Sequence, residues 1–173
     1  VSRSMHLFKH ENPAASEVLE KLKLPVFVKP NNGGSSIGMS KVSKPEEMAA
    51  ALEKALKEDD QVLVEEFISG REFTVGVFRS SAGIMVMPLT EVKTTKDFFD
   101  GEAKYSPGGT EETTPAVVED SVAERIRAVA KKIYQVFNCN GVVRIDMIYN
   151  EAKGEPFLLE INTVPGQTEA SVV

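Results

Sequence analysis

The chain has 173 residues, 42% of them hydrophobic and 27% charged, which is typical of a soluble globular protein of about one to one and a half domains. Its net charge of −6 argues against a general nucleic-acid-binding protein, because such proteins neutralise phosphates with lysine and arginine. A single cysteine excludes an internal disulfide framework, and no apolar run approaches the roughly 18 residues that a membrane helix needs.

The two ends of the chain indicate a fragment. The N-terminal stretch VSRSMHLFK has neither an initiator methionine nor the charged start, apolar centre and cleavage site of a signal peptide. The last residues, EASVV, end on apolar groups without a polar tail. We therefore expect a piece of a longer protein, and the lone Cys139 favours a reducing, cytoplasmic location.

Three stretches predict helices. Asn12, as N-cap, and Pro13, at the first helical position, begin a helix that ends at Pro25. Ser43 is expected to cap a second helix, with Glu46 completing a capping box. The clearest helix covers residues 119–138, and its apolar stripe should comprise Val122, Ile126, Val129, Ile133 and Val136.

Other stretches predict strands because they are rich in β-branched residues and are bounded by turn residues. They cover residues 26–30, 39–42, 61–68, 71–78 and 83–89, with two more between residues 142 and 162. From Thr90 to Pro115 the apolar periodicity vanishes, which predicts a functional lid or a disordered segment. The mixed order of helices and strands predicts an α+β fold with mostly antiparallel sheets.

The last two strands carry polar residues where buried strands call for apolar ones. The stretch RIDMIYNEAKGEPFLLEINTVPG, residues 144–166, contains Arg144 and Asp146 on one strand, with Glu160 and Asn162 on the next. Side chains two residues apart share a face of a strand. We therefore expect Arg144 and Asp146 to project together, and Leu158 to share a face with Glu160 and Asn162.

A turn centred on Lys153 would place Asp146 opposite Glu160 and Arg144 opposite Asn162. Two carboxylates at that separation repel each other unless a proton or a cation lies between them. Carboxylate and amide oxygens are ligands that Mg²⁺ or Mn²⁺ accepts. An alternative is a solvent-exposed sheet face with an incidental Arg–Asp pair.

Two further stretches suit a nucleotide. In VKPNNGGSSIG, Lys29 precedes a glycine-serine loop whose amides and hydroxyls can donate to phosphate oxygens, although the order differs from that of a P-loop. In VLVEEFISGRE, a strand runs into a hinge next to Glu65, Glu66 and Glu72, which offers backbone groups to adenine and a carboxylate to ribose. Taken alone, the first stretch would be interpreted as a plain hairpin loop and the second as a surface strand pair.

Together, the segments VFVKPNNGGSSIGMSKV, VLVEEFISGREFTV, EAKYS, GVVRIDMIY and FLLEINTVPGQT resemble the ATP-grasp domain of D-alanine–D-alanine ligases. The resemblance covers nearly the whole chain. It implies two small α+β lobes with nucleotide bound between them: a smaller lobe at residues 26–68, and a larger lobe from residues 1–25 and 69–173 with the metal site and a closing ω-loop. The family's N-terminal domain is missing from the chain.

The resemblance also implies a reaction. In that family ATP phosphorylates the carboxylate of one D-alanine, and the amine of a second attacks the acyl phosphate, giving a peptidoglycan precursor. We expect the substrates to be D-alanine and ATP, with two Mg²⁺ or Mn²⁺ ions and no nucleic-acid or membrane partner. We also expect a full-length homodimer and no activity from this chain alone. Two alternatives remain: a ligase for another amino or hydroxy acid such as D-lactate, and a non-catalytic nucleotide-binding module.

The residues that match the family's motifs fall into four groups. The metal ligands are Asp146, Glu160 and Asn162. Residues for ATP are Lys29, Ser35, Ser36, Glu65, Glu66, Phe67, Ile68, Glu72 and Lys104. Residues for catalysis are Arg144, Lys104, Tyr105, Gly166 and Ser36, and residues for the second substrate are Ser171 and Gly166. Tyr105 marks the dipeptide-forming branch of the family. His6 and His10 are expected to be structural or surface residues.

Overall fold

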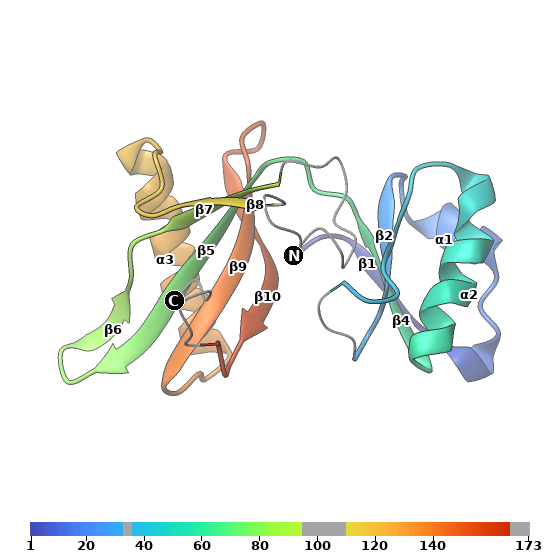
Figure 1. Ribbon diagram of the computed structural model, residues 1–173, viewed down its shortest axis with the longest axis horizontal. Helices are drawn as coiled ribbons and strands as arrows, with labels where there is room; N and C mark the ends of the chain where they lie inside the picture. Colours follow the sequence, from blue (N-terminus) through green and yellow to red (C-terminus); the bar gives the residue numbers. More distant parts are fainter. Residues whose placement is uncertain (33–35, 95–109, 167–173) are drawn as a thin grey trace. The chain divides into compact units, whose positions relative to one another are not determined.

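The computed structural model describes residues 1–32, 36–94 and 110–166. The chain folds as two compact units (Figure 1). The first unit comprises Ser2–Phe67, and the second combines Ile68–Lys93 with residues 111–166. None of the helices in these described ranges is long and apolar enough to cross a membrane.

The first unit is an antiparallel sheet with helices on one side. Its strand order is β1-β4-β2-β3, and both main helices lie on the same side of the strands (Figure 1). The strands are β1 (Ser4–Phe8), β2 (Val26–Pro30), β3 (Ser40–Val42) and β4 (Gln61–Glu66). The helices are α1 (Ala15–Lys21) and α2 (Met48–Glu58), and the short 3₁₀ turns are η1 (Lys9–Glu11) and η2 (Pro45–Glu47).

Alternation along β2 explains how this unit buries its core. Val26 and Val28 are fully buried against the helices, while Phe27 and Lys29 are only half-buried. Helices α1 and α2 add Val18, Met48 and Leu52 to the same core. Since side chains alternate between faces, the opposite face of the sheet carries Phe27 and Lys29.

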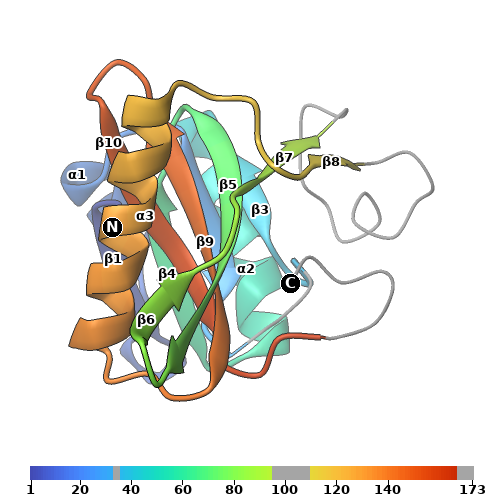
Figure 2. The ribbon, with the colours of Figure 1, turned by 90° about the vertical axis from the view of Figure 1, so that its left-hand side faces the viewer.

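The second unit is a larger antiparallel sheet covered by one long helix. Its strand order is β10-β9-β5-β7-β8, and β6 also pairs with β5. Helix α3 (Asp120–Val136) lies over the strands (Figure 2). The strands are β5 (Arg71–Ser80), β6 (Gly83–Val86), β7 (Thr90–Thr94), β8 (Thr110–Thr113), β9 (Val142–Asn150) and β10 (Glu155–Asn162).

One face of this sheet packs against α3 and the other carries the polar groups. Val143, Ile145 and Met147 of β9 are fully buried in the core that α3 covers. Arg144 and Asp146 therefore point to the opposite face. Burial of one face thus decides where the polar residues of β9 can lie.

The junction between β4 and β5 needs a glycine. A Cβ on Gly70 would lie 2.2 Å from the carbonyl oxygen of Tyr149, which no side chain can tolerate. Asn150 donates from Nδ2 to the carbonyl of Ser69 at 2.8 Å, so this connection is held against the end of β9.

An ion pair between the half-buried Arg71 and the buried Glu91 links β5, β7 and the segment that leads to α3. Arg71 donates from Nε and Nη2 to the two carboxylate oxygens of Glu91 at 2.7 and 2.9 Å, and from Nη2 to the carbonyl of Val117 at 2.9 Å. Glu91 is only 3% exposed. Two parallel hydrogen bonds between a guanidinium and a carboxylate fix the orientation of the two side chains relative to each other.

This pair should make the stability of the protein depend on pH. Hydrogen bonds from Arg71 outweigh burial and hold the pKa of Glu91 below its ordinary value of 4.5. Because the pKa of Glu91 is lower in the folded state than in the unfolded state, its ionised carboxylate stabilises the fold at any pH above the unfolded-state pKa. This stabilisation is lost as the pH falls through the folded-state pKa and the carboxylate is protonated. We expect Glu91→Gln to reduce the free energy of unfolding by about 1.5–3 kcal/mol near neutral pH. The difference should shrink below about pH 4.5, as measured by urea unfolding followed by circular dichroism.

The exposed neighbour provides the control. Lys93 lies with its Nζ 3.7 Å from Glu91 Oε2, and its side chain is 58% exposed. Lys93→Met should therefore change the free energy of unfolding by less than about 0.5 kcal/mol. A gap between Glu91→Gln and the unaltered chain that stays constant from neutral to acidic pH would contradict the assignment.

The α+β class with antiparallel sheets is confirmed, but several local predictions are wrong. Residues 2–25, expected in the larger lobe, belong to the first unit, because β1 pairs with β4 and α1 packs in that unit's core. Asn12 does not cap α1; it ends η1 in a left-handed conformation, with φ of 47°. The Glu47 carboxylate, not that of Glu46, accepts from the backbone amides of Ser43 and Lys44.

Two further predictions need adjustment. The expected patternless segment from Thr90 to Pro115 begins and ends in strands, β7 and β8, and residues 95–109 lie outside the described residues. Helix α3 places the expected residues Val122, Ile126, Val129 and Ile133 in or against the core, but not Val136. It buries Ala123, Ile126, Ala130 and Tyr134, whereas Val136 is 70% exposed.

Candidate active site

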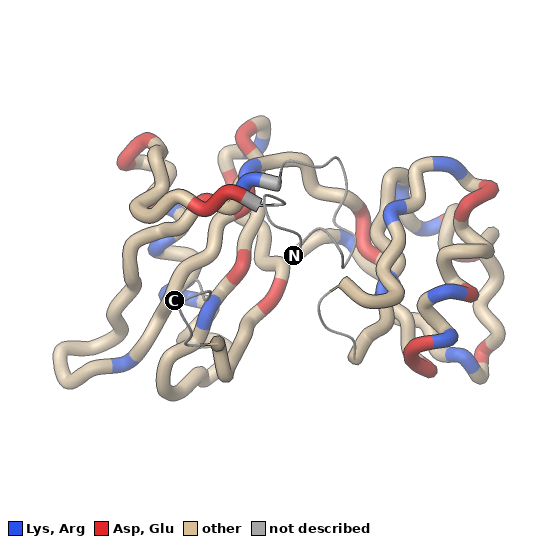
Figure 3. Tube along the Cα trace, in the orientation of Figure 1, with Lys and Arg blue, Asp and Glu red and all other residues tan. Residues whose placement is uncertain are grey.

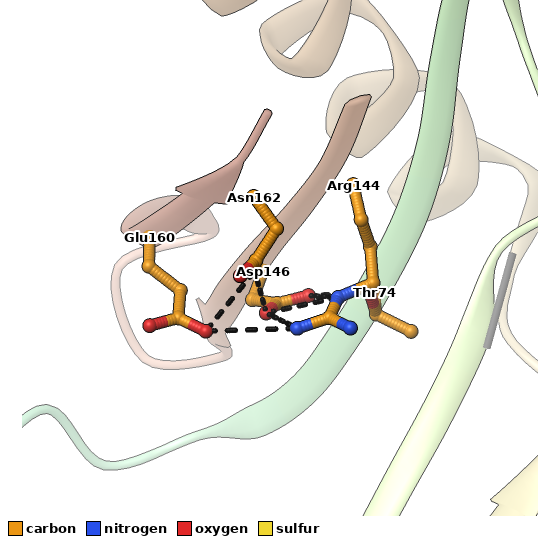
Figure 4. Close-up of polar contacts among 5 residues, drawn as sticks. All are labelled: Thr74, Arg144, Asp146, Glu160 and Asn162. Atoms are coloured by element: carbon orange, nitrogen blue, oxygen red, sulfur yellow. Dashed lines mark hydrogen bonds and ion pairs between the residues drawn. The ribbon is translucent and has the colours of Figure 1, made fainter. Parts of the chain in front are cut away.

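Strands β9 and β10 bring the four polar residues together on the face away from α3 (Figure 4). Asp146 pairs with Glu160 and Arg144 pairs with Asn162 in the antiparallel ladder. Both pairings agree with the expectation from the alternation of the two strands. Figure 3 shows acidic and basic positions side by side on β9, with an acidic position on the adjoining β10.

A β-bulge, rather than a regular hairpin, produces this pairing. Asn150 pairs with Glu155 across a four-residue turn, so the turn is not centred on Lys153. The register then shifts between Leu158 and Glu160, which leaves Leu159 as an extra residue. Leu158 consequently pairs with Met147 and packs against the core, so its predicted placement on the face of Glu160 is wrong.

Asp146 is the buried centre of the site. It is 8% exposed, and its carboxylate receives the guanidinium of Arg144 in a forked arrangement. Arg144 Nε lies 3.0 Å from Oδ1 and 3.2 Å from Oδ2, and Nη2 lies 2.9 Å from Oδ2. A charged donor on each oxygen compensates for removing the carboxylate from water.

Glu160 lies at the exposed edge of the same cluster. Its side chain is 58% exposed, and its Oε1 is 3.6 Å from Arg144 Nη2. Asn162 joins the two acids, because its Nδ2 is 3.1 Å from both Asp146 Oδ2 and Glu160 Oε1. The two carboxylates therefore converge on shared donors.

Arg144 stays positively charged at this site. Burial alone would lower the pKa of its guanidinium, but the hydrogen bond and charge of Asp146, with Glu160 and Glu112 nearby, raise it above the ordinary value. A permanent cation is thus held against two acids on one sheet face.

Thr74 on β5 completes the surroundings of Asp146, and sequence reasoning missed it. It pairs with Asp146 in the β5–β9 ladder, and its Oγ1 donates to Asp146 Oδ1 (Figure 4). The hydroxyl is buried, with Thr74 only 5% exposed. The available signal was a polar residue inside the apolar strand EFTVGV. Glu72, two residues earlier, shares the face of Thr74.

The first unit holds a second group of candidate residues. Lys29 Nζ forms an ion pair with Glu65 Oε2 at 2.5 Å, and Ser2 Oγ lies 3.3 Å from Glu65 Oε1. The rings of Phe27 and Phe67 have centroids 5.9 Å apart, and Lys41 Nζ lies 4.4 Å from the centroid of Phe67. This sheet face therefore combines aromatic rings with cations, a surface that suits a base and its phosphates.

The remaining candidates are placed less fully. Ser35, Lys104, Tyr105 and Ser171 lie outside the described residues. Ser36 is half-buried with a left-handed φ of 59°, Gly166 is exposed, and Glu66 accepts a hydrogen bond from the Lys23 amide at 2.8 Å. Ile68 is the first residue of the second unit.

The donor set that could hold a metal ion is small. Across the described parts of the chain, no three His, Cys, Asp or Glu side chains gather as a metal site. His6 instead contacts Gln61 Oε1 at 2.9 Å and the ring of Phe8. The candidate set on β9 and β10 has two carboxylates, Asp146 and Glu160, and needs the Asn162 amide as a third ligand.

Two α+β units with antiparallel sheets, each covered by helices on one side, define an ATP-grasp fold. The chain belongs to the family described as D-ala D-ala ligase C-terminus, whose model matches residues 2–173. It is 43% identical, over its whole length, to the D-alanine--D-alanine ligase of Parabacteroides distasonis, and it covers 52% of that protein. The chain thus spans about half the length of the curated relatives it matches.

Solved structures agree with this assignment. The chain superposes on the VanG D-Ala:D-Ser ligase from Enterococcus faecalis with a TM-score of 0.87 and 34% identity, covering 99% of this chain and 50% of that one. It superposes on the D-alanine--D-alanine ligase of Bacillus anthracis complexed with ATP with a TM-score of 0.80 and 28% identity. That match covers 99% of this chain and 52% of the other.

Proposed function

We propose that the full-length protein ligates two D-alanines at the expense of ATP, and that this chain is its ATP- and metal-binding part. The observation that carries the proposal is the convergence of Asp146, Glu160, Arg144 and Asn162 on one sheet face, in a chain that belongs to this ligase family. The product would serve as a peptidoglycan precursor.

The residues on β9 and β10 suit a divalent cation. Asp146 and Glu160 offer carboxylate oxygens from facing positions, and hard cations such as Mg²⁺ or Mn²⁺ prefer such ligands. Asn162 now presents its amide nitrogen to both acids, and a half-turn of the amide would present its oxygen instead. Two bound ions would neutralise charge on the phosphates during transfer.

Arg144 would act on the transferring phosphoryl group. Phosphoryl transfer asks a protein mainly for positioning and for stabilisation of charge on the oxygens. The guanidinium stays charged and reaches two acids from one position. When cations occupy the carboxylates, Arg144 would be released toward phosphate, and the Gly166 amide would stabilise the oxyanion that forms when the second amine attacks.

We assign ATP binding to the residues that match the nucleotide-binding motifs of the family. Lys29 would exchange its present partner Glu65 for phosphate oxygens, with Ser35, Ser36 and Lys104 as further donors. Residues 65–68 would contact the adenine, and the Glu72 carboxylate would bind the ribose hydroxyls. Tyr105 and Ser171 would lie near the substrates. We extend the proposal to a cytoplasmic homodimer of the full-length protein, without nucleic-acid or membrane partners.

A second candidate concerns the acceptor substrate. The similar VanG structure is that of a D-Ala:D-Ser ligase, so the full-length protein could join D-alanine to another amino or hydroxy acid. Supplying the full-length protein with ATP, Mg²⁺, D-alanine and either D-serine or D-lactate, and identifying products by mass spectrometry, separates these activities. We expect D-alanyl-D-alanine as the main product. ATP binding without any ligation product would instead favour a non-catalytic module.

A further inference from the structure

Resting on the proposed function, we infer that Thr74 is a positioning residue that fixes Asp146 and selects which of its oxygens faces the cation. The inference starts from the sheet register. Thr74 lies directly opposite Asp146 on the neighbouring strand, and its hydroxyl donates to Oδ1. The contact therefore comes from β5, outside the β9–β10 hairpin that supplies the cation ligands.

The two oxygens of Asp146 have different neighbours. Oδ1 receives the Thr74 hydroxyl and Arg144 Nε, at 3.0 Å from the latter. Oδ2 receives Arg144 Nη2 at 2.9 Å, Asn162 Nδ2 at 3.1 Å and, as a longer contact, the same Arg144 Nε at 3.2 Å. Only Oδ1 receives the Thr74 hydroxyl, and only Oδ2 receives Asn162. Since Asn162 Nδ2 also reaches Glu160 Oε1, Oδ2 is the oxygen on the side of Glu160. A cation shared by the two acids would therefore bind Oδ2.

Thr74 and Arg144 differ in how firmly they hold the carboxylate. Arg144 is a long side chain with 26% of its surface exposed, and its proposed task requires it to leave Asp146 for phosphate. Thr74 is short, β-branched and 5% exposed, so its rotamer is restricted by its own strand. Its hydroxyl would remain on Oδ1 after Arg144 departs, which keeps Asp146 oriented.

The experiment measures cation binding directly. Full-length protein is titrated with Mn²⁺ in the presence of a non-hydrolysable ATP analogue, and free Mn²⁺ is followed by electron paramagnetic resonance. Thr74→Val keeps the shape of the side chain and removes the hydroxyl. We expect Thr74→Val to weaken Mn²⁺ affinity about 10-fold or more, because partners that orient a metal ligand contribute about 10–100-fold. Thr74→Ser should stay within about 3-fold of the unaltered protein.

Thr90 offers a matched control. It pairs with Thr74 across β5 and β7, is equally buried at 5% exposure, and bonds to Thr114 rather than to Asp146. Thr90→Val should leave Mn²⁺ affinity unchanged. If Thr74→Val does not fold, Thr74→Ser and Thr74→Ala serve instead, since they differ from each other only in the hydroxyl.

The outcomes separate the inference from the proposed function. Equal Mn²⁺ affinity in Thr74→Val and the unaltered protein, or in the serine and alanine variants, overturns the role of Thr74 alone. If the unaltered protein binds no Mn²⁺, or binds it as well after Asp146→Asn, the metal site fails and the inference fails with it. Weaker binding in Thr90→Val to the same degree as in Thr74→Val would assign the effect to loss of a buried hydroxyl in general.

Discussion

Glu160→Gln in the full-length protein should reduce ligation of D-alanine by at least about 10²-fold, while leaving the fold intact. The variant keeps the size of the side chain and removes the negative charge that would face a cation together with Asp146. Because the Glu160 side chain is 58% exposed, its loss costs little stability. Steady-state kinetics at saturating ATP and D-alanine, with Mg²⁺ varied, would measure the loss.

The same strand provides the comparison. Glu155 is an exposed acid at the other end of β10, where it pairs with Asn150 next to the turn. Glu155→Gln removes the same charge from the same strand, and its turnover should equal that of the unaltered protein. If Glu160→Gln also turned over normally, Glu160 would not be a metal ligand. A loss in both variants would point to the net charge of the strand instead.

Tyr134→Ala should destabilise the second unit by about 3–5 kcal/mol, the range for removing a large aromatic side chain from a core. Tyr134 is a fully buried residue of α3, and its hydroxyl donates to the carbonyl of Gly141 at 2.9 Å, just before β9. The substitution therefore leaves a cavity and also frees the entry to the strand that carries Arg144 and Asp146. The chain contains no tryptophan, so urea unfolding is best followed by far-ultraviolet circular dichroism.

Two other substitutions separate the contribution of the Tyr134 ring from that of its hydrogen bond and control for a change on the same helix. Tyr134→Phe retains the ring and removes only the hydrogen bond to Gly141, which should cost about 1 kcal/mol. Val136→Ala changes a residue of the same helix that is 70% exposed, and it should cost less than about 0.5 kcal/mol. If Val136→Ala proved as harmful as Tyr134→Ala, the orientation of α3 described above would be wrong.

The polar residues of β9 and β10 could be predicted because strand alternation is a local rule. Arg144 and Asp146 are two residues apart, so any strand places them on one face. Thr74 could not be found in this way, since it lies far from Asp146 in the chain and meets it only through the pairing of β5 with β9. Neighbouring strands are decided by the packing of the whole sheet, about which alternation along a single strand carries no information.

Helix α3 shows a second limit. Its period predicts an amphipathic helix over the correct residues, and Val122, Ile126, Val129 and Ile133 do lie in or against the core. The predicted stripe omits Ala123, Ala130 and Tyr134, which are buried, and includes Val136, which is exposed. Alanines allow close approach of helix and sheet, and a tyrosine can be buried when its hydroxyl finds an acceptor. Hydrophobicity alone ranks the valines higher, so the two alanines and Tyr134 were not predicted as core residues.

Because Leu159 is an extra residue in β10, this strand can lose one residue without a change in how the two acids pair. Removing Leu159 would leave Leu158 beside Met147 and Glu160 beside Asp146, because the ladder on either side of the bulge is already aligned. The turn at residues 151–154 can therefore change without altering the pairing of Asp146 with Glu160. A designer could exchange that loop, or an evolving lineage could lose one residue from this strand, without moving the two carboxylates apart.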